Sequence, residues 1–262
     1  MKRFTSAISA LLILASPSAS AQDPIVNKRL KEIGERFEQL PLEARTEYVK
    51  LKRKATEASR RQKFFTCMVA IEDALKIFPD DMDLIWLQGI CRAQIHDVDA
   101  AIYHYDNVRK INPNHVPTLM NLVEINFFAG RYEKTAEYIV YINKLIKSRG
   151  NNSLPLLDFK YLISLSKLAK KDPAKYGAEL EKMYDLRGYM EDNPYYYYAN
   201  ALKNFDSGDK QEGLIWILKA YLIFNSPPLI ETWNKALVDT GFIGAHEIMF
   251  NRSGNEEGQR KQ

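Results

Sequence analysis

The residues that could do chemistry in this chain are few and scattered. Its four histidines have no spacing typical of metal ligands; they are His96, His104, His115 and His246. The acidic run Asp80-Asp81-x-Asp83 lacks the glycine and the distal glutamate of a calcium-binding loop. Neither a glycine-rich phosphate loop nor a Gly-x-Ser-x-Gly elbow is present. The sequence therefore predicts no enzyme activity, no metal and no cofactor.

Residues 1–21 have the pattern of a secretory signal. Lys2 and Arg3 precede a mostly apolar stretch, and Ala19-Ser20-Ala21 offers small residues for cleavage. The apolar stretch is too short to span a membrane. We expect an exported protein, in the periplasm of a bacterium or secreted; an uncleaved anchor is the alternative.

Export gives the two cysteines a chemical context, because exported chains meet oxidising conditions. Cys67 lies twelve residues before Pro79, and Cys91 lies twelve residues after it. If the chain turns as an antiparallel helical hairpin at Pro79, the two thiols sit at the same height along the helices. A Cys67–Cys91 disulfide is one hypothesis, and two buried thiols that act as small apolar residues are the other.

Charge is the remaining candidate chemistry. Removal of Lys2 and Arg3 with the signal leaves 37 − 2 = 35 basic and 33 acidic residues, a net charge of +2 that favours no particular partner. Locally, the segment 42–61 is strongly basic, with Lys50, Lys52, Arg53, Lys54, Arg60 and Arg61. This basic patch could bind an acidic segment or an anionic membrane surface, or it could be a solvated face. Export and the lack of a recognised module argue against nucleic acid.

The elements that must position these residues are helices, which recur in a 34-residue frame. An apolar helix, a polar break at 95–97, a second apolar helix and Asn112-Pro113 make up one period, 82–115. Four columns of residues repeat at this spacing: Ala55, Gly89, Val123; Cys67, Ala101, Thr135; Ala74, Val108, Ile142; and Ile71, Tyr105, Ile139. The pattern resembles the tetratricopeptide repeat (TPR) family. The resemblance implies an all-α fold, a right-handed superhelix (solenoid) of antiparallel helix pairs.

The same frame predicts how the chain is divided. The segments are a signal peptide at 1–21, an amphipathic helix at 22–41, three TPR-like repeats at 42–149, a divergent helix pair at 150–193, a fourth repeat at 194–227, capping helices at 228–250 and a disordered tail at 251–262. The helix at 22–41 carries one apolar stripe, formed by Val26, Leu30, Ile33, Phe37 and Leu40. We expect this stripe to pack on the first repeat; a short dimerising seam is the alternative.

The helix register around Trp86 stays open. One register points Ile85, Gln88 and Arg92 inward, and a shift by one residue points Trp86, Gly89, Ile90 and Ala93 inward instead. The second register avoids burying two polar side chains, so we expect Trp86 in the core.

The TPR resemblance also implies a binding surface, because the first helix of each pair lines the concave side. The implied groove residues are Lys52 and Thr56 in the first repeat, Met120, Glu124, Phe127 and Phe128 in the third, and Tyr198, Leu202 and Phe205 in the fourth. Such a groove would suit a protein or peptide with an acidic end. The carboxylate clamp of chaperone-tail-binding relatives is not matched, since only Lys52 fits among Lys52, Thr56, Leu87, Pro117 and Asn121.

The sequence thus favours an exported TPR scaffold that binds a protein partner in its groove. Four alternatives remain. The groove aromatic residues could pack within the protein, or the helix at 22–41 could lie in the groove itself. The chain could also be a subunit that self-associates through residues 22–41, or a helical enzyme acting on envelope polymers.

Overall fold

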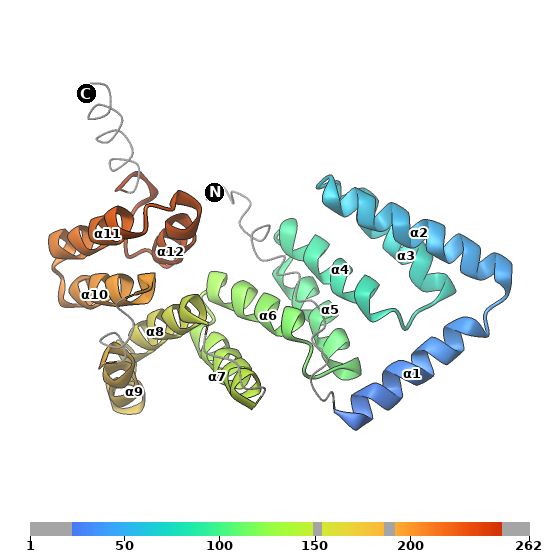
Figure 1. Cartoon of the computed structure of the whole chain (residues 1–262), viewed down its shortest axis with the longest axis horizontal. Helices are drawn as coiled ribbons and strands as arrows, with labels where there is room; N and C mark the ends of the chain where they lie inside the picture. The colour runs from blue at the N-terminus through green and yellow to red at the C-terminus, as the bar shows by residue number, and fades with distance from the viewer. Residues whose placement is uncertain (1–22, 149–153, 186–191, 248–262) are drawn as a thin grey trace, which may run out of the picture. The chain divides into compact units, whose positions relative to one another are not determined.

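The structure is a computed structural model that describes residues 23–148, 154–185 and 192–247. These residues form helices and no strand, so the fold is all-α (Figure 1). The described helices are α1 (Pro24–Glu38), α2 (Leu42–Arg60), α3 (Phe64–Ile77), α4 (Met82–Gln94), α5 (Val98–Ile111), α6 (Val116–Phe128), α7 (Tyr132–Ser148), α8 (Pro155–Ala169), α9 (Pro173–Asp185), α10 (Pro194–Ser207), α11 (Lys210–Phe224) and α12 (Pro227–Asp239). The predicted signal peptide and disordered tail lie outside the described residues.

The chain divides into two compact units, Met1–Ile125 and Asn126–Gln262. The boundary falls inside α6, and therefore inside the third predicted repeat. In the first unit, α2 packs against α3, α3 against α4, and α4 against α5. In the second unit, α7 packs against α8, α8 against α9 and α10, and α10 against α11. Consecutive helices are thus the main packing partners in each unit.

Short polar signals start and stop these helices. Asp81, Asp97 and Asp209 are N-caps whose side chains accept a hydrogen bond from the backbone amide three residues later. Gly208 ends α10 in the left-handed region at φ = 90°, where a side chain would be strained. Proline occupies the first turn of α8, α9, α10 and α12, where its missing amide is not needed. These signals explain why the predicted and observed helix ends nearly coincide.

The repeated columns form the interior of the helix pairs. All twelve column residues are buried. The glycine column position shows why a small residue is required, because a Cβ on Gly89 would lie 2.5 Å from the buried ring of Tyr105. Gly213 meets Phe205 in the same way, at 2.3 Å. Close helix contact therefore depends on these two glycines.

Helix α1 is fastened to the first unit at both ends. Its apolar stripe faces inward, with Ile33, Phe37 and Leu40 against the core of this unit. A guanidinium nitrogen of Arg29 donates to the carbonyl oxygens of Lys110 and Ile111 at the end of α5 (3.2 Å to Ile111). Arg36 pairs with Asp80, in the turn after α3, at 2.7 Å. Figure 1 shows α1, in dark blue, running across these helix ends.

Helix α8 is the centre of the second unit. Almost every residue from Leu157 to Leu168 is buried, including the polar side chains of Asp158, Lys160, Ser164 and Ser166. The predicted apolar face at 157, 161, 165 and 168 is therefore only part of its contact surface. The polar groups have partners: Asn143 donates to Asp158 at 2.9 Å, and the Ser166 hydroxyl donates to Asp206 at 2.9 Å.

The helix register expected around Trp86 holds only in part. Its side chain is half-buried, and its ring meets His115 edge-on at 6.1 Å between centroids. Gly89 and Ala93 of the expected register are buried, and so are Leu84, Gln88 and Cys91. Gln88 is buried in α4, although we expected a register that keeps this polar side chain out of the core.

Candidate functional site

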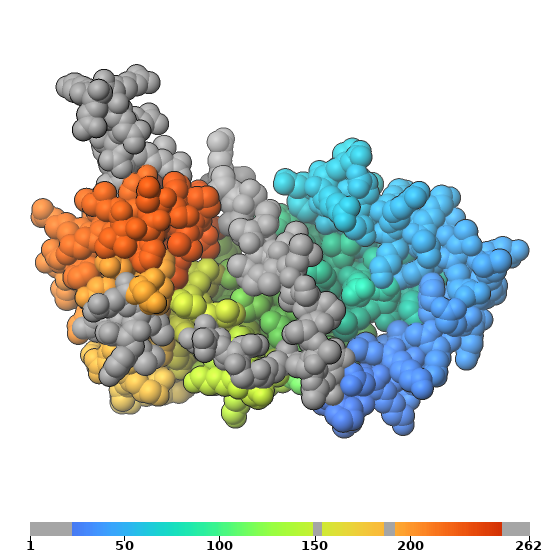
Figure 2. Space-filling model, in the orientation of Figure 1, coloured from blue at the N-terminus to red at the C-terminus, as the bar shows by residue number. Residues whose placement is uncertain are grey.

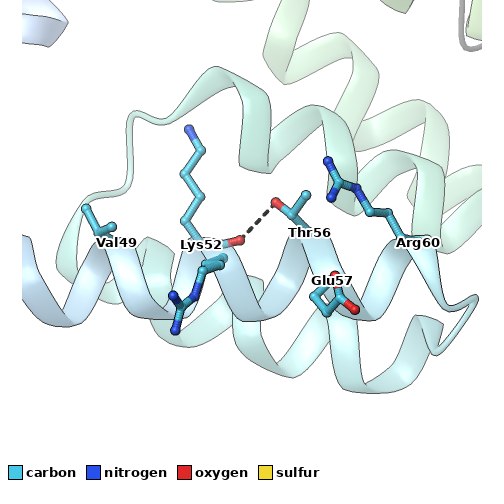
Figure 3. Close-up of a pocket in the computed structure, with 6 residues that line it drawn as sticks. Val49, Lys52, Thr56, Glu57 and Arg60 are labelled. Carbon is cyan, nitrogen blue, oxygen red and sulfur yellow. Dashed lines mark hydrogen bonds between the residues drawn. The ribbon is translucent and has the colours of Figure 1, made fainter.

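The exposed face of α2 carries a shallow, open hollow. Its volume is about 350 Å³, and its lining residues all come from α2: Val49, Lys52, Arg53, Thr56, Glu57 and Arg60 (Figure 3). They recur at steps of three and one, so that they share one side of a single helix. Helix α2 lies at the surface of its unit (Figure 2, light blue). We call these six residues the α2 hollow.

Three cations and one carboxylate line the α2 hollow. Glu57 is already paired, with the guanidinium of Arg61 at 2.6 Å. Arg53 and Arg60 are exposed, and neither has an ion-pair partner among the described residues. Figure 3 shows the side chains of Lys52, Thr56 and Arg60 projecting from the same side of the helix. The hollow therefore presents uncompensated positive charge to a ligand.

Lys52 has a second task, because it links α2 to the turn before α4. Its ammonium lies 2.6 Å from Asp81 and 3.4 Å from Asp83. Burial works to lower the pKa of Lys52, but the hydrogen bonds and charges of the two aspartates outweigh burial and raise it. Lys52 is thus a charged residue at the edge of the hollow whose position is fixed by its own protein.

The hydroxyl and apolar members of the hollow shape it. The Thr56 hydroxyl donates to the backbone carbonyl of Lys52 at 3.0 Å, drawn as the dashed line in Figure 3. This bond is local to the helix and leaves the threonine methyl group as well as the oxygen lone pairs for a ligand. Val49 is 57% exposed at the other end of the hollow. An acidic segment with one apolar side chain would satisfy both kinds of group.

The structure redistributes the predicted basic patch. Arg53 and Arg60 join Lys52 and Thr56 in the α2 hollow, which combines members of two sets that the sequence treated separately. The other three patch residues do not line the hollow. Lys50 pairs with Glu47 at 3.3 Å and Arg61 with Glu57, while Lys54 contributes to lowering the pKa of Asp73 on α3. Val49 and Glu57 were not predicted, although their spacing from Lys52 and Arg60 on one helix could have identified them.

Several predicted groove residues are wrong as direct partner contacts, because they are buried. Tyr198 and Leu202 are fully buried, Phe127 is 3% exposed and Met120 is 9% exposed. The Tyr198 hydroxyl donates to the side-chain oxygen of Asn234 on α12 at 2.6 Å. The helices around α10 therefore cover the side that was expected to face a groove.

The remaining groove residues divide between packing and exposure. Phe205 packs on Gly213 and stacks on Phe242, with ring centroids 6.3 Å apart. Glu124 is half-buried, and Phe128 is 36% exposed with Lys235 over its ring at 5.8 Å. The alternative that the groove aromatic residues pack within the protein applies to Phe127, Tyr198 and Phe205.

The titratable groups do not assemble an acid–base pair in the described regions. The carboxyl groups with a shifted pKa are Asp73, Asp81, Glu133 and Glu247, and every one is shifted downward. A general acid would need the opposite shift. His104 and His115 have a lowered pKa, caused first by burial, and they do not share a site. Within the described chain no cluster of three or more His, Cys, Asp or Glu side chains could hold a metal ion.

Among the helices that the structure describes, none combines the length and the apolar character needed to cross a bilayer. No protein-family model fits the chain, and no curated protein is significantly similar to it. The argument for function therefore depends on the residues and the geometry given above.

Proposed function

We propose that this protein is an exported TPR-like scaffold that holds the acidic segment of a protein partner on the α2 hollow. The observation that carries the proposal is the exposed pair Arg53 and Arg60, which have no ion-pair partner in the described part of the chain, beside the anchored cation of Lys52. Burial of all twelve column residues supports the repeat architecture. The right-handed superhelix and the export remain parts of this proposal.

The apolar stripe of α1 favours scaffold function over self-association. Residues that pack on their own core are not free to form a dimer seam, and Ile33, Phe37 and Leu40 do so. Hence we expect the full chain to remain a monomer across a light-scattering concentration series. A dimer that is lost with this segment would instead support the self-associating subunit.

A direct test uses a fluorescein-labelled Glu-rich peptide with a central leucine as the probe. Its affinity is measured by anisotropy for the wild type, for the double variant Arg53→Glu/Arg60→Glu and for the control Lys50→Glu. Lys50 lies on the same helix outside the hollow and is paired with Glu47. The control changes net charge by two and the double variant by four, so a second control with two reversals outside the hollow, Lys50→Glu/Lys54→Glu, matches the charge.

Each exposed ion pair contributes up to about 1 kcal/mol, so the double variant should bind the peptide roughly 5- to 30-fold more weakly. Salt should reduce the difference, because the Debye length falls from about 10 Å at 0.1 M to about 3 Å at 1 M. Equal weakening by the charge-matched control would show that net charge, and not the α2 hollow, attracts the peptide. Unchanged binding by the double variant would remove the hollow from the proposal.

Export has its own test. The chain is expressed in a bacterium with its own residues 1–21. It should be recovered from the periplasmic fraction, with the mass of a chain cleaved after Ala21. An intact N-terminus in the cytoplasmic fraction would contradict the export proposal and leave the peptide-binding proposal unaffected.

A further inference from the structure

The two cysteines of the chain meet in the core of the first unit. Cys67 lies on α3 and Cys91 on α4, helices that pack against each other. Both side chains are wholly buried. The core around them is aliphatic and aromatic, with Ile71 and Leu84 among its members. No other cysteine exists in the sequence, so each thiol has one possible partner within its own chain.

Both thiols are free in this structure, and they lie near enough for each to shift the pKa of the other. The sulfur of Cys67 also lies against the backbone of Ser59 on α2. The interaction with Cys91 lowers the pKa of the Cys67 thiol, and the same interaction together with burial raises the pKa of Cys91. These opposite shifts show that the two thiols are neighbours in the folded core.

We propose that Cys67 and Cys91 form an intrachain disulfide that ties α3 to α4. Both thiols are buried in one core, on helices that pack against each other, and this placement supports a bond that the position of Pro79 alone could not establish. The proposal uses no element of the α2 hollow and stands independently of the proposed function.

The chemistry is thiol–disulfide exchange with an external disulfide, either that of a thiol oxidoreductase or a small-molecule disulfide. The thiolate of one cysteine attacks one external sulfur, and a mixed disulfide forms as the first external thiolate leaves. The thiolate of the other cysteine then attacks the chain's own sulfur in that mixed disulfide and releases the second external thiolate. Two protons and two electrons leave the protein in total, and the external disulfide is reduced to two thiols.

Burial fixes when the bond can form. An external disulfide cannot reach sulfur atoms that are wholly buried in the folded chain, so the exchange takes place during folding or when α3 and α4 separate. Once formed, the bond joins the α2–α3 pair to the α4–α5 pair and closes a loop that contains the turn before α4. The reduced, folded protein should accordingly resist oxidation while it stays folded.

The test refolds the full chain from urea in glutathione redox buffers of graded ratio. A parallel series keeps the chain unfolded in urea at the same ratios. Free thiols are trapped with a maleimide after denaturation, counted by mass, and located by peptide mapping without reduction. The quantity compared is the ratio of reduced to oxidised glutathione at which half of the chains carry the disulfide. If native contacts favour the bond, this ratio should be at least tenfold higher for the refolded chain than for the unfolded chain.

A Cys67–Cys91 linked peptide in the monomer, together with that tenfold difference, is the expected result. Two free thiols in the refolded chain, at ratios where the unfolded chain is oxidised, would overturn the proposal. So would equal half-oxidation ratios in the two series, because native packing would then contribute nothing. The control Cys91→Ser should keep one thiol and give no linked peptide; the decisive comparison uses the wild type alone and does not depend on how that variant folds.

Discussion

Replacement of Asp81 by alanine should destabilise the first unit more than any other single change to a charged residue there. Three interactions meet at this carboxylate, which is 10% exposed. One oxygen accepts from the amide of Leu84 at 2.9 Å and caps α4. The other accepts from the Tyr48 hydroxyl and from the Lys52 ammonium, the latter at 2.6 Å. Helices α2 and α4 are thus joined through one side chain.

The magnitude follows from these three parts. Loss of an aspartate N-cap costs about 1 kcal/mol. A hydroxyl left without an acceptor beside the buried Tyr48 ring costs about 1–2 kcal/mol more. The half-exposed ion pair with Lys52 adds less than about 1 kcal/mol, because water screens it. We expect Asp81→Ala to lower the free energy of unfolding by about 3 kcal/mol, and Asp81→Asn, which keeps the cap, by about 1 kcal/mol.

Urea unfolding followed by circular dichroism at neutral pH measures the effect. A slope of about 2 kcal/mol per molar urea converts 3 kcal/mol into a midpoint shift of about 1.5 M. The control Asp99→Ala removes a carboxylate from the first turn of α5 that is exposed and not the cap of that helix. This control should shift the midpoint by less than about 0.5 M.

The same carboxylate predicts a pH dependence. Burial works to raise the pKa of Asp81, but hydrogen bonds from Lys52, Tyr48 and the Leu84 amide hold it below its ordinary value of about 3.8. A pKa that is lower in the folded chain than in the unfolded chain adds stability above the unfolded-state value and loses it as the pH falls through the folded-state value. The gap in stability between wild type and Asp81→Asn should therefore close below about pH 4. A gap that stays constant down to pH 2, or an alanine variant as stable as wild type, would refute the reasoning.

Three further substitutions test the packing within the two units. Gly89→Ala should destabilise the protein by about 1–2 kcal/mol, because the new methyl group overlaps the buried ring of Tyr105; Gly34→Ala, where nothing lies within 4 Å, should stabilise it by about 0.5–1 kcal/mol. Equal urea midpoints for these two variants would contradict the close contact at Gly89. Tyr198→Phe should cost about 1–3 kcal/mol, since it leaves the buried oxygen of Asn234 without its donor. A thermal unfolding midpoint within error of wild type would show that another group takes the place of the hydroxyl.

The helices could be predicted from the sequence because their ends carry strong local signals. Asp-capped turns and prolines mark boundaries that tertiary packing does not move, so the predicted 82–94 and 98–111 helices coincide with α4 and α5. The interior columns could be predicted for a related reason. Gly89 must be small because the ring of Tyr105 occupies the space beside it. A position that must stay small is visible in the sequence as part of a repeated column.

The direction that each aromatic side chain faces could not be predicted. Helices α8 and α10 carry large apolar residues on several sides, so periodicity does not single out one buried face. In the run Tyr195 to Tyr198, the first and last rings are fully buried while the middle two are half-buried. Which pair enters the core depends on α8 and α12, and no local pattern records that choice. The groove contacts proposed for Tyr198 and Leu202 failed for this reason.

The α2 hollow lay between these two cases. Its cations were visible as a basic run, but charge alone did not separate Arg53 and Arg60, which are unpaired among the described residues, from Lys50 and Arg61, which have acidic partners on their own helix. Only side-chain geometry distinguishes them. The acidic turn, which seemed notable only as a failed calcium loop, supplies the cap and the anchor for Lys52.

Helix α1 has a consequence for how the first unit melts. In a row of stacked helix pairs each pair touches mainly its neighbours, so that an end can fray while the rest persists. Arg29 reaches carbonyl oxygens 81 and 82 residues further along the chain, and Arg36 holds the turn between α3 and α4. Helix α1 thus links helices at opposite ends of the first unit. Separation of the α4–α5 hairpin from the unit would break the contacts of Arg29 and so release α1. Amide protons of α1 and of α5 should accordingly exchange in a single cooperative opening.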